Sequence, residues 1–129
     1  MSQRITAANQ SALLAAVNAD PEFRLASRFW NGCFRLSLGA EEAYLFRVRD
    51  GELVQVNRRP TFFDAWDFEI AGPKEGWSEI FARTPRPFYQ DVASALFRHG
   101  FTLGGDVESF FAYHAALRRL IDVMRRSSS

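Results

Sequence analysis

The sequence predicts an α+β fold, in which a mostly antiparallel sheet of about five strands is covered on one face by helices. Apolar and polar residues alternate through residues 32–71, as in half-buried strands, and apolar residues recur at helical spacing before and after that stretch. Strands and helices are therefore segregated along the chain. With 129 residues, of which 47% are hydrophobic, the chain has room for one core of ordinary size, so we expect a single domain over residues 1–129.

Two helices are predicted over residues 6–31. Thr6 can cap the first helix, because its side-chain oxygen can accept a hydrogen bond from a free backbone N–H of the first turn. Asp20-Pro21 marks the start of the second helix, because proline at the first helical position loses no hydrogen bond. Apolar residues then follow at helical spacing, and the second helix is expected to end near Asn31.

The sheet is predicted over residues 32–71. Its first three alternating runs form an antiparallel meander with one wet face, and the apolar positions are Phe34, Leu36, Leu38, Tyr44, Phe46, Val48, Val54 and Val56. Asp50-Gly51, between the second and third runs, is a strong hairpin signal, because both central residues of a type I′ turn need positive φ. A fourth strand is expected at residues 66–70.

Two further helices are expected over residues 73–99. Pro73 opens the first of them, which carries Trp77, and the two prolines within residues 84–87 end it. The second continues to about residue 99, and Gly100 stands where a left-handed helix cap is usual.

A short strand over residues 101–103 and a C-terminal helix over residues 106–126 complete the predicted order. Gly104-Gly105 is expected to form the turn between them, with Asp106 as the N-cap of the helix. The apolar stripe of this helix advances in steps of three and four residues, through Phe110, His114, Leu117, Ile121 and Met124.

Composition and charge argue against several classes of protein. Because 16 basic and 15 acidic residues give a net charge of +1, we expect no nucleic-acid partner. One cysteine, Cys33, and two histidines are too few for a four-ligand zinc site, and we expect neither a metal nor a cofactor. No apolar run reaches the ~18 residues that span a bilayer, and no apolar signal core follows the N-terminus. We therefore expect a cytoplasmic protein without an integral membrane segment.

Aromatic residues are unusually frequent, at 15% of the chain, with 13 Phe and 3 Trp. Such an excess either fills a thick core or lines a cavity for an apolar ligand. The residues alone favour the core. A cavity would make a hydrophobic small molecule the expected partner.

Four local patterns follow one another in a recognisable order and spacing. They are the strand pair around Tyr44–Gly51, the alternating Trp66–Ile70, the helix around Glu75-Gly76-Trp77, and Phe101–Asp106 before a long helix. Together they span roughly residues 30–126 and resemble the bacterial sterol carrier protein 2-like (SCP2) domain family. The resemblance implies a five-stranded sheet with helices packed over it, enclosing an apolar tunnel for sterols, fatty acids, acyl-CoA esters or other lipids.

This resemblance makes a ligand cavity the favoured interpretation of the aromatic excess. It implies a protein that binds or carries a lipid or another bulky apolar molecule of the sterol, fatty acid or acyl-CoA type. The residues expected to contact the ligand are Trp66, Phe68, Trp77, Phe81, Phe97, Phe101, Phe110, Phe111, His114 and Leu117.

His114 lies within the apolar stripe, where a buried imidazole needs a polar partner. It is either a core histidine satisfied by a nearby carbonyl or hydroxyl, or a cavity residue that contacts a ligand oxygen or acts as acid or base. Catalysis would make the protein a cofactor-independent isomerase, hydratase or cyclase for a polycyclic or polyketide-like substrate, with Tyr113 or Tyr44 as a second polar group. A third alternative is a domain that only forms a homodimer or partner interface. We favour the non-catalytic binder.

Other polar residues carry weaker hypotheses. Asp67 and Glu69 share one face of the fourth strand and are interpreted as a solvated sheet face, and Cys33 is interpreted as a small buried thiol. Several arginines either form solvated surface or hold an anionic headgroup at the mouth of a cavity. They are Arg47, Arg49, Arg58, Arg59, Arg118, Arg119, Arg125 and Arg126.

Overall fold

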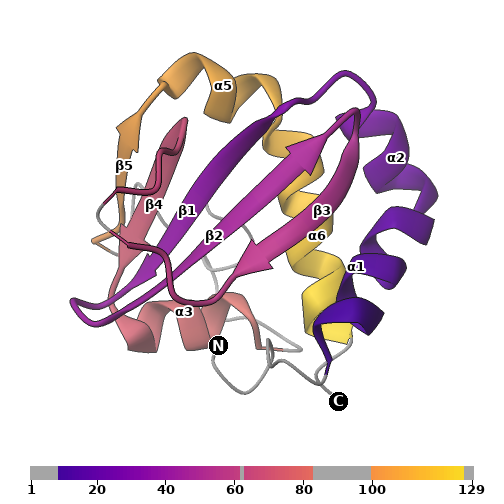
Figure 1. The fold of residues 1–129 in the computed structure, drawn as a ribbon. Helices are drawn as coiled ribbons and strands as arrows, with labels where there is room; N and C mark the ends of the chain where they lie inside the picture. The colour runs from indigo at the N-terminus through magenta and orange to yellow at the C-terminus, as the bar shows by residue number, and fades with distance from the viewer. Residues whose placement is uncertain (1–8, 62, 83–99, 127–129) are drawn as a thin grey trace.

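A five-stranded sheet with the strand order β3-β2-β1-β4-β5 forms one layer of the molecule, and helices cover one of its faces (Figure 1). The structure, a computed structural model, describes residues 9–61, 63–82 and 100–126. The strands are β1 (Gly32–Leu38), β2 (Glu42–Arg49), β3 (Glu52–Asn57), β4 (Phe68–Gly72) and β5 (Thr102–Gly105). The helices are α1 (Gln10–Ala19), α2 (Pro21–Ser27), α3 (Lys74–Ile80), α5 (Val107–Ala112) and α6 (His114–Arg126). Only the β1–β4 pair is parallel among these strands, which confirms the predicted α+β fold with a mostly antiparallel sheet.

The turn between β2 and β3 has the conformation predicted from its two residues. Asp50 has φ +50° and Gly51 has φ +79°, as a type I′ turn requires. The turn also fixes the neighbouring helix, because Ser27 Oγ donates a 2.7 Å hydrogen bond to the Gly51 carbonyl oxygen. A Cβ at Gly51 would lie 2.9 Å from the Ser27 carbonyl oxygen, so glycine allows this close approach of turn and helix.

The fourth strand does not continue the meander beyond β3. β4 lies beside β1 and runs parallel to it, with Phe68 opposite Phe34. The segment between β3 and β4 therefore crosses in front of β2 and β1, on the face opposite the helices (Figure 1). Leu45 points to that face and is nevertheless buried. The sheet face predicted to be exposed to solvent is thus partly covered by the crossing segment.

β5 extends further than the predicted strand over residues 101–103. Gly104 and Gly105, expected to form a turn, pair with Glu69 and Phe68 of β4. Gly105 has φ +85°, and a Cβ there would lie 2.5 Å from the Asp67 carbonyl oxygen. The strand therefore ends at Gly105 in a left-handed conformation that favours glycine, and Asp106 caps the next helix as predicted.

The N-terminal helices differ from the predicted pair mainly at their ends. Thr6 lies outside the described residues, and the described part of α1 begins at Gln10. The second helix ends at Ser27 rather than near Asn31, and Trp30 leaves it to pack against the inner face of the sheet. The helix predicted over residues 88–99 lies outside the described residues.

The C-terminal helix predicted over residues 106–126 is divided into α5 and α6. The break falls at Tyr113, which has φ −116° and ψ +18°. The Tyr113 ring stacks on Trp30 with a centroid distance of 4.8 Å, and its hydroxyl donates a 3.3 Å hydrogen bond to the Phe29 carbonyl oxygen. We attribute the break to these tertiary contacts, because they hold Tyr113 where an unbroken helix would not place it.

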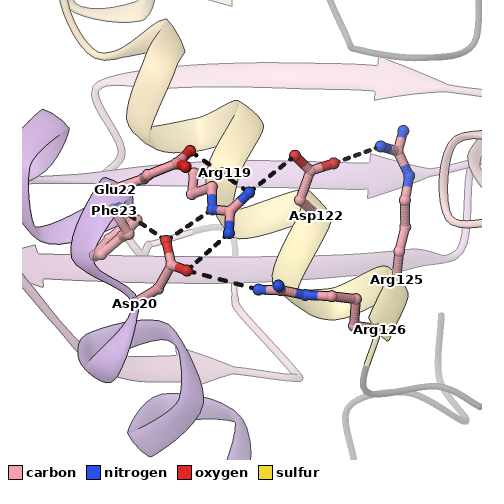
Figure 2. A network of polar contacts seen from close by, with 7 residues as sticks. All are labelled: Asp20, Glu22, Phe23, Arg119, Asp122, Arg125 and Arg126. Atoms are coloured by element: carbon pink, nitrogen blue, oxygen red, sulfur yellow. Dashed lines mark hydrogen bonds and ion pairs between the residues drawn. The ribbon is translucent and has the colours of Figure 1, made fainter.

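Asp20 connects the N-terminal helices to α6 (Figure 2). It caps α2, at the start predicted from Asp20-Pro21, because its carboxylate accepts a 2.9 Å hydrogen bond from the Phe23 N–H. Arg119 donates from Nε and Nη2 to the two carboxylate oxygens of Asp20, at 2.8 and 2.9 Å. Arg126 lies 3.6 Å from the same carboxylate. Because Asp20 is buried and the pair is bidentate, it fixes α6 against the start of α2.

This pair predicts how stability depends on pH. Hydrogen bonds from Arg119 lower the pKa of Asp20 from its ordinary value of 3.8 to about 2. Because the pKa is lower in the folded state, the stabilisation is fully present above about pH 4 and is lost as the pH falls through about 2. We expect the difference in free energy of unfolding between wild type and Asp20→Asn to be constant from about pH 5 to 7 and to shrink below about pH 4. Urea unfolding at each pH measures it, and an unchanged difference at about pH 2 would contradict the assignment.

Candidate ligand-binding site

The helix-covered face of the sheet carries a stack of aromatic rings. Phe46, Phe34 and Phe68 come from the adjacent strands β2, β1 and β4, with centroid distances of 4.9 and 5.4 Å and rings within 4° of parallel. Trp30 stacks on Phe34 at 5.5 Å, and Tyr113 stacks on Trp30 at 4.8 Å. This part of the interior is therefore filled by rings and forms a wall rather than a space for a ligand.

A second aromatic group lies at the start of β4. The Phe110 ring meets Phe68 edge-on at 5.7 Å, and Phe111 and His114 lie 5.0 and 5.5 Å from the same Phe110 ring. Phe110 is fully buried, and so is Leu117, which lies one turn after His114 in α6. The α5–α6 break thus brings an imidazole to the edge of the aromatic interior.

A third aromatic group lies at the end of β4. Trp77 of α3 stacks on Phe81 at 5.9 Å and meets Phe101 edge-on at 5.1 Å. The Trp77 indole N–H donates a 2.9 Å hydrogen bond to the Ser37 carbonyl oxygen. All three rings are buried, so α3 is held at this end of the sheet by apolar packing and one buried hydrogen bond.

Two glycines make room for the Phe101 ring. A Cβ at Gly72 of β4 or at Gly76 of α3 would lie 2.6 Å from a ring carbon of Phe101. Contacts that short do not occur between carbon atoms, so Phe101 would have to move if either glycine carried a side chain. The position of Phe101 therefore depends on both glycines.

Gly72→Ala should destabilise the protein by about 1–3 kcal/mol, because the new methyl group overpacks the buried Phe101 ring. Gly104→Ala is the matched control, because a Cβ there has no neighbour within 4 Å. Urea unfolding measures both. In a Phe101→Leu background, Gly72→Ala should cost less, since leucine lacks the ring atoms that clash. An equal cost in both backgrounds would contradict this packing.

His114 has an unpaired buried atom. Its Nε2 is inaccessible to solvent and makes no hydrogen bond with any described residue. The side chain also borders a surface pocket of about 370 Å³ between α2 and α6, which contains Glu22, Arg118 and Asp122. The hydroxyls proposed as catalytic partners are engaged elsewhere, because Tyr113 donates to Phe29 and Tyr44 donates to Glu42. The structure therefore pairs His114 with neither tyrosine.

Comparisons with known proteins give matches by structure only. No protein-family model and no curated protein matches the sequence. A crystal structure of sterol carrier protein 2 is similar with a TM-score of 0.72 and 21% identity, covering 93% of this chain and 95% of that one. This chain has an SCP2-like fold. A conserved hypothetical protein of Thermus thermophilus, described as a possible sterol carrier protein, has a TM-score of 0.71 and 21% identity over 96% of this chain and 89% of its own. The ubiquinone synthesis protein UbiJ-SCP2 has a TM-score of 0.60 and 16% identity over 100% and 98%.

Within this SCP2-like fold, most of the residues predicted to contact a ligand lie on the helix-covered side. The buried ones in the described chain are Phe68, Trp77, Phe81, Phe101, Phe110 and Leu117. Phe111 touches Phe110 but is 60% exposed, and Phe97 lies outside the described residues. Trp66 is half-buried and borders a different surface pocket, with Cys33 and Arg47. The Trp66 ring lies beside Gly105, near the start of β4, and Trp66 is not among the buried residues of the aromatic groups.

The opposite face of the sheet carries polar pockets. One of about 500 Å³ contains Arg35, Arg58 and Arg59 beside the segment that crosses the sheet. Glu69, interpreted from sequence as solvated, pairs with Arg35 at 3.1 Å and accepts a hydrogen bond from Ser37. These arginines lie on the face away from the aromatic groups.

The Asp67 side chain is hydrogen-bonded to the backbone of Cys33 at the start of β1. The Asp67 carboxylate accepts a 2.9 Å hydrogen bond from the Cys33 N–H. Burial raises the pKa of the Cys33 thiol, which keeps it protonated and disfavours the thiolate form of a nucleophile. Across the residues that the structure describes, no His, Cys, Asp and Glu side chains form a group suited to a metal ion. Within the same residues, no helix is long and apolar enough to cross a membrane.

Of the rings in the aromatic stack, the sequence singled out only Phe68 as a ligand-contacting residue. Phe34 and Phe46 were expected only to face the core, and Tyr113 was considered only as a catalytic partner of His114. Alternation places the three phenylalanines on the apolar side of their strands. Their stacking depends on β4 lying beside β1, for which residues 66–70 carry no local signal.

Proposed function

We propose that the protein binds or carries a lipid or another bulky apolar small molecule along the helix-covered face of β4. The observation that carries this proposal is the arrangement of buried aromatic groups at the two ends of that strand in an SCP2-like fold. Phe110 meets Phe68 at one end, and Phe101 packs against Gly72 at the other. One of the similar structures is described as sterol carrier protein 2, a second as a possible sterol carrier protein, and a third as a ubiquinone synthesis protein.

The residues between these ends support an apolar ligand. Ile70 is buried at the middle of β4, and its β5 partner Leu103 is half-buried against the core. Leu117 is buried in α6. A surface of aromatic and aliphatic side chains with few polar groups is typical of sites for apolar small molecules. Sterols, fatty acids and acyl-CoA esters are the ligand types proposed.

A blocking variant tests the location of the site. A fluorescent fatty acid or sterol should bind wild type saturably at one site and change the emission of Trp77, which lies at one end of the proposed site. Leu103→Trp should weaken binding at least tenfold, because the larger side chain, opposite Ile70, would occupy part of the proposed site. Val54→Trp on β3 is the control, because Val54 is exposed.

Two results would contradict the proposal. One is an absence of binding for fatty acids, acyl-CoA esters and sterols alike. The other is equal affinity in wild type and in a folded Leu103→Trp variant, since the ligand would then lie elsewhere.

A cytoplasmic location and a homodimer stay predictions from the sequence.

A further inference from the structure

We infer that the ligand is an amphiphile whose one polar group hydrogen-bonds to Nε2 of His114. This inference rests on the proposed function and adds the chemical class of the ligand and its orientation. The observation behind it is the buried Nε2, which has no hydrogen-bond partner among the described residues. An unpaired buried polar atom is destabilising, and native proteins retain few of them.

The carboxylates around His114 are already paired with Arg119. Glu22 of α2 and Asp122 of α6 border the same surface pocket, and both pair with Arg119, at 3.5 and 3.7 Å (Figure 2). Arg118 borders that pocket as well, but it carries a charge and is exposed. Nε2 of His114, by contrast, is buried, and the His114 ring lies 5.5 Å from the Phe110 ring. The apolar neighbour Phe110 offers no conventional hydrogen bond, so within the described part of the chain Nε2 is left without a partner, and we assign that role to the bound ligand.

The imidazole also limits which polar group fits. A neutral histidine presents either an N–H donor or a lone-pair acceptor at Nε2, depending on its tautomer. A hydroxyl group satisfies both forms, whereas a carboxylate or carbonyl oxygen satisfies the donor form. The polar end of the ligand is therefore a hydroxyl, carbonyl or carboxyl group, and a plain hydrocarbon leaves Nε2 unpaired.

The position of His114 sets the direction of the ligand. His114 lies with Phe110 at the Phe68 end of β4, whereas Phe101 lies at the Gly72 end. The four residue steps from Phe68 to Gly72 span about 13 Å at the usual rise of a strand. The apolar body of the ligand thus extends along β4 from His114 towards Phe101.

A matched pair of probes tests this inference. Pyrenedodecanoic acid and dodecylpyrene have the same ring and chain, and only the first carries a carboxyl group. Titration by pyrene fluorescence should show wild type binding the acid about tenfold more tightly, as expected for one buried hydrogen bond. His114→Phe should reduce this ratio to near one without weakening the binding of dodecylpyrene. His114→Gln, which keeps a donor and an acceptor, should retain part of the preference.

Leu25→Ala, at an exposed position on α2 that is not among the proposed ligand contacts, should leave the ratio unchanged and serves as the control. Urea unfolding of each variant establishes that it is folded. If wild type binds both probes equally, or if His114→Phe keeps the preference for the acid, the inference is overturned while the proposed function stands. If wild type binds neither probe, nor any fatty acid or sterol, the proposed function and the inference are overturned together.

Discussion

Phe34→Ala should lower the free energy of unfolding by about 3–5 kcal/mol, the range usual for removing a buried phenylalanine ring. Phe34 is fully buried at the centre of the aromatic stack and contacts rings on both neighbouring strands and on Trp30. Its loss would leave a cavity between the Phe46, Phe68 and Trp30 rings, and the sheet register holds the first two on the neighbouring strands. Urea unfolding followed by circular dichroism measures the change.

Phe111→Ala is the control for this experiment, because it removes the same side chain from an exposed position. It should change the free energy of unfolding by less than about 1 kcal/mol. Similar costs for Phe34→Ala and Phe111→Ala would show that the stack does not stabilise the fold as its geometry indicates.

Asp20→Ala should cost about 3 kcal/mol, because it removes two interactions at once. The helix cap of α2 contributes about 1 kcal/mol. The remainder comes from leaving Arg119, a mostly buried guanidinium, without its bidentate partner. Asp20→Asn should cost less, since the amide oxygen can still cap the helix. Urea unfolding at neutral pH measures both variants.

Glu22→Ala provides the matched control, because Glu22 pairs with the same Arg119 at 3.5 Å but is 74% exposed. Exposed ion pairs contribute little, so this variant should change stability by less than about 0.5 kcal/mol. If Glu22→Ala were as costly as Asp20→Ala, the burial of Asp20 would not be the source of its effect.

Local chemistry accounts for the parts of the fold that the sequence predicted. The Asp20-Pro21 pair specifies a cap and a first helical residue, and the helix starts there. The Asp50-Gly51 pair specifies two positive φ angles, and the turn has them. In both cases the structure depends on two adjacent residues, so no knowledge of distant contacts is needed.

Tertiary contacts account for the parts that it did not predict. The parallel pairing of β4 with β1 depends on the path of the crossing segment. The break at Tyr113 depends on stacking with Trp30, which lies far earlier in the chain. For the same reason, the sequence placed His114 on an apolar stripe but could not show that Nε2 would lack a partner.

The sequence predicted which large apolar residues of strands and helices would lie on the helix-covered side, but it did not predict where β4 begins. Phe68, Trp77, Phe101 and Phe110 lie on the helix-covered side, as large apolar residues in a strand or an amphipathic helix usually do. Trp66 does not, because β4 begins only at Phe68 and the alternation of the strand does not extend back to Trp66.

Native mass spectrometry of the protein, expressed in cells and purified without detergent, tests most directly whether the chain binds an apolar small molecule. The expected spectrum shows one apolar molecule per chain, which denaturation releases and chloroform extracts. Leu103→Trp, purified in the same way, should carry none. A wild-type spectrum without any bound molecule, combined with no uptake of added fatty acids, acyl-CoA esters or sterols, would contradict the proposed function.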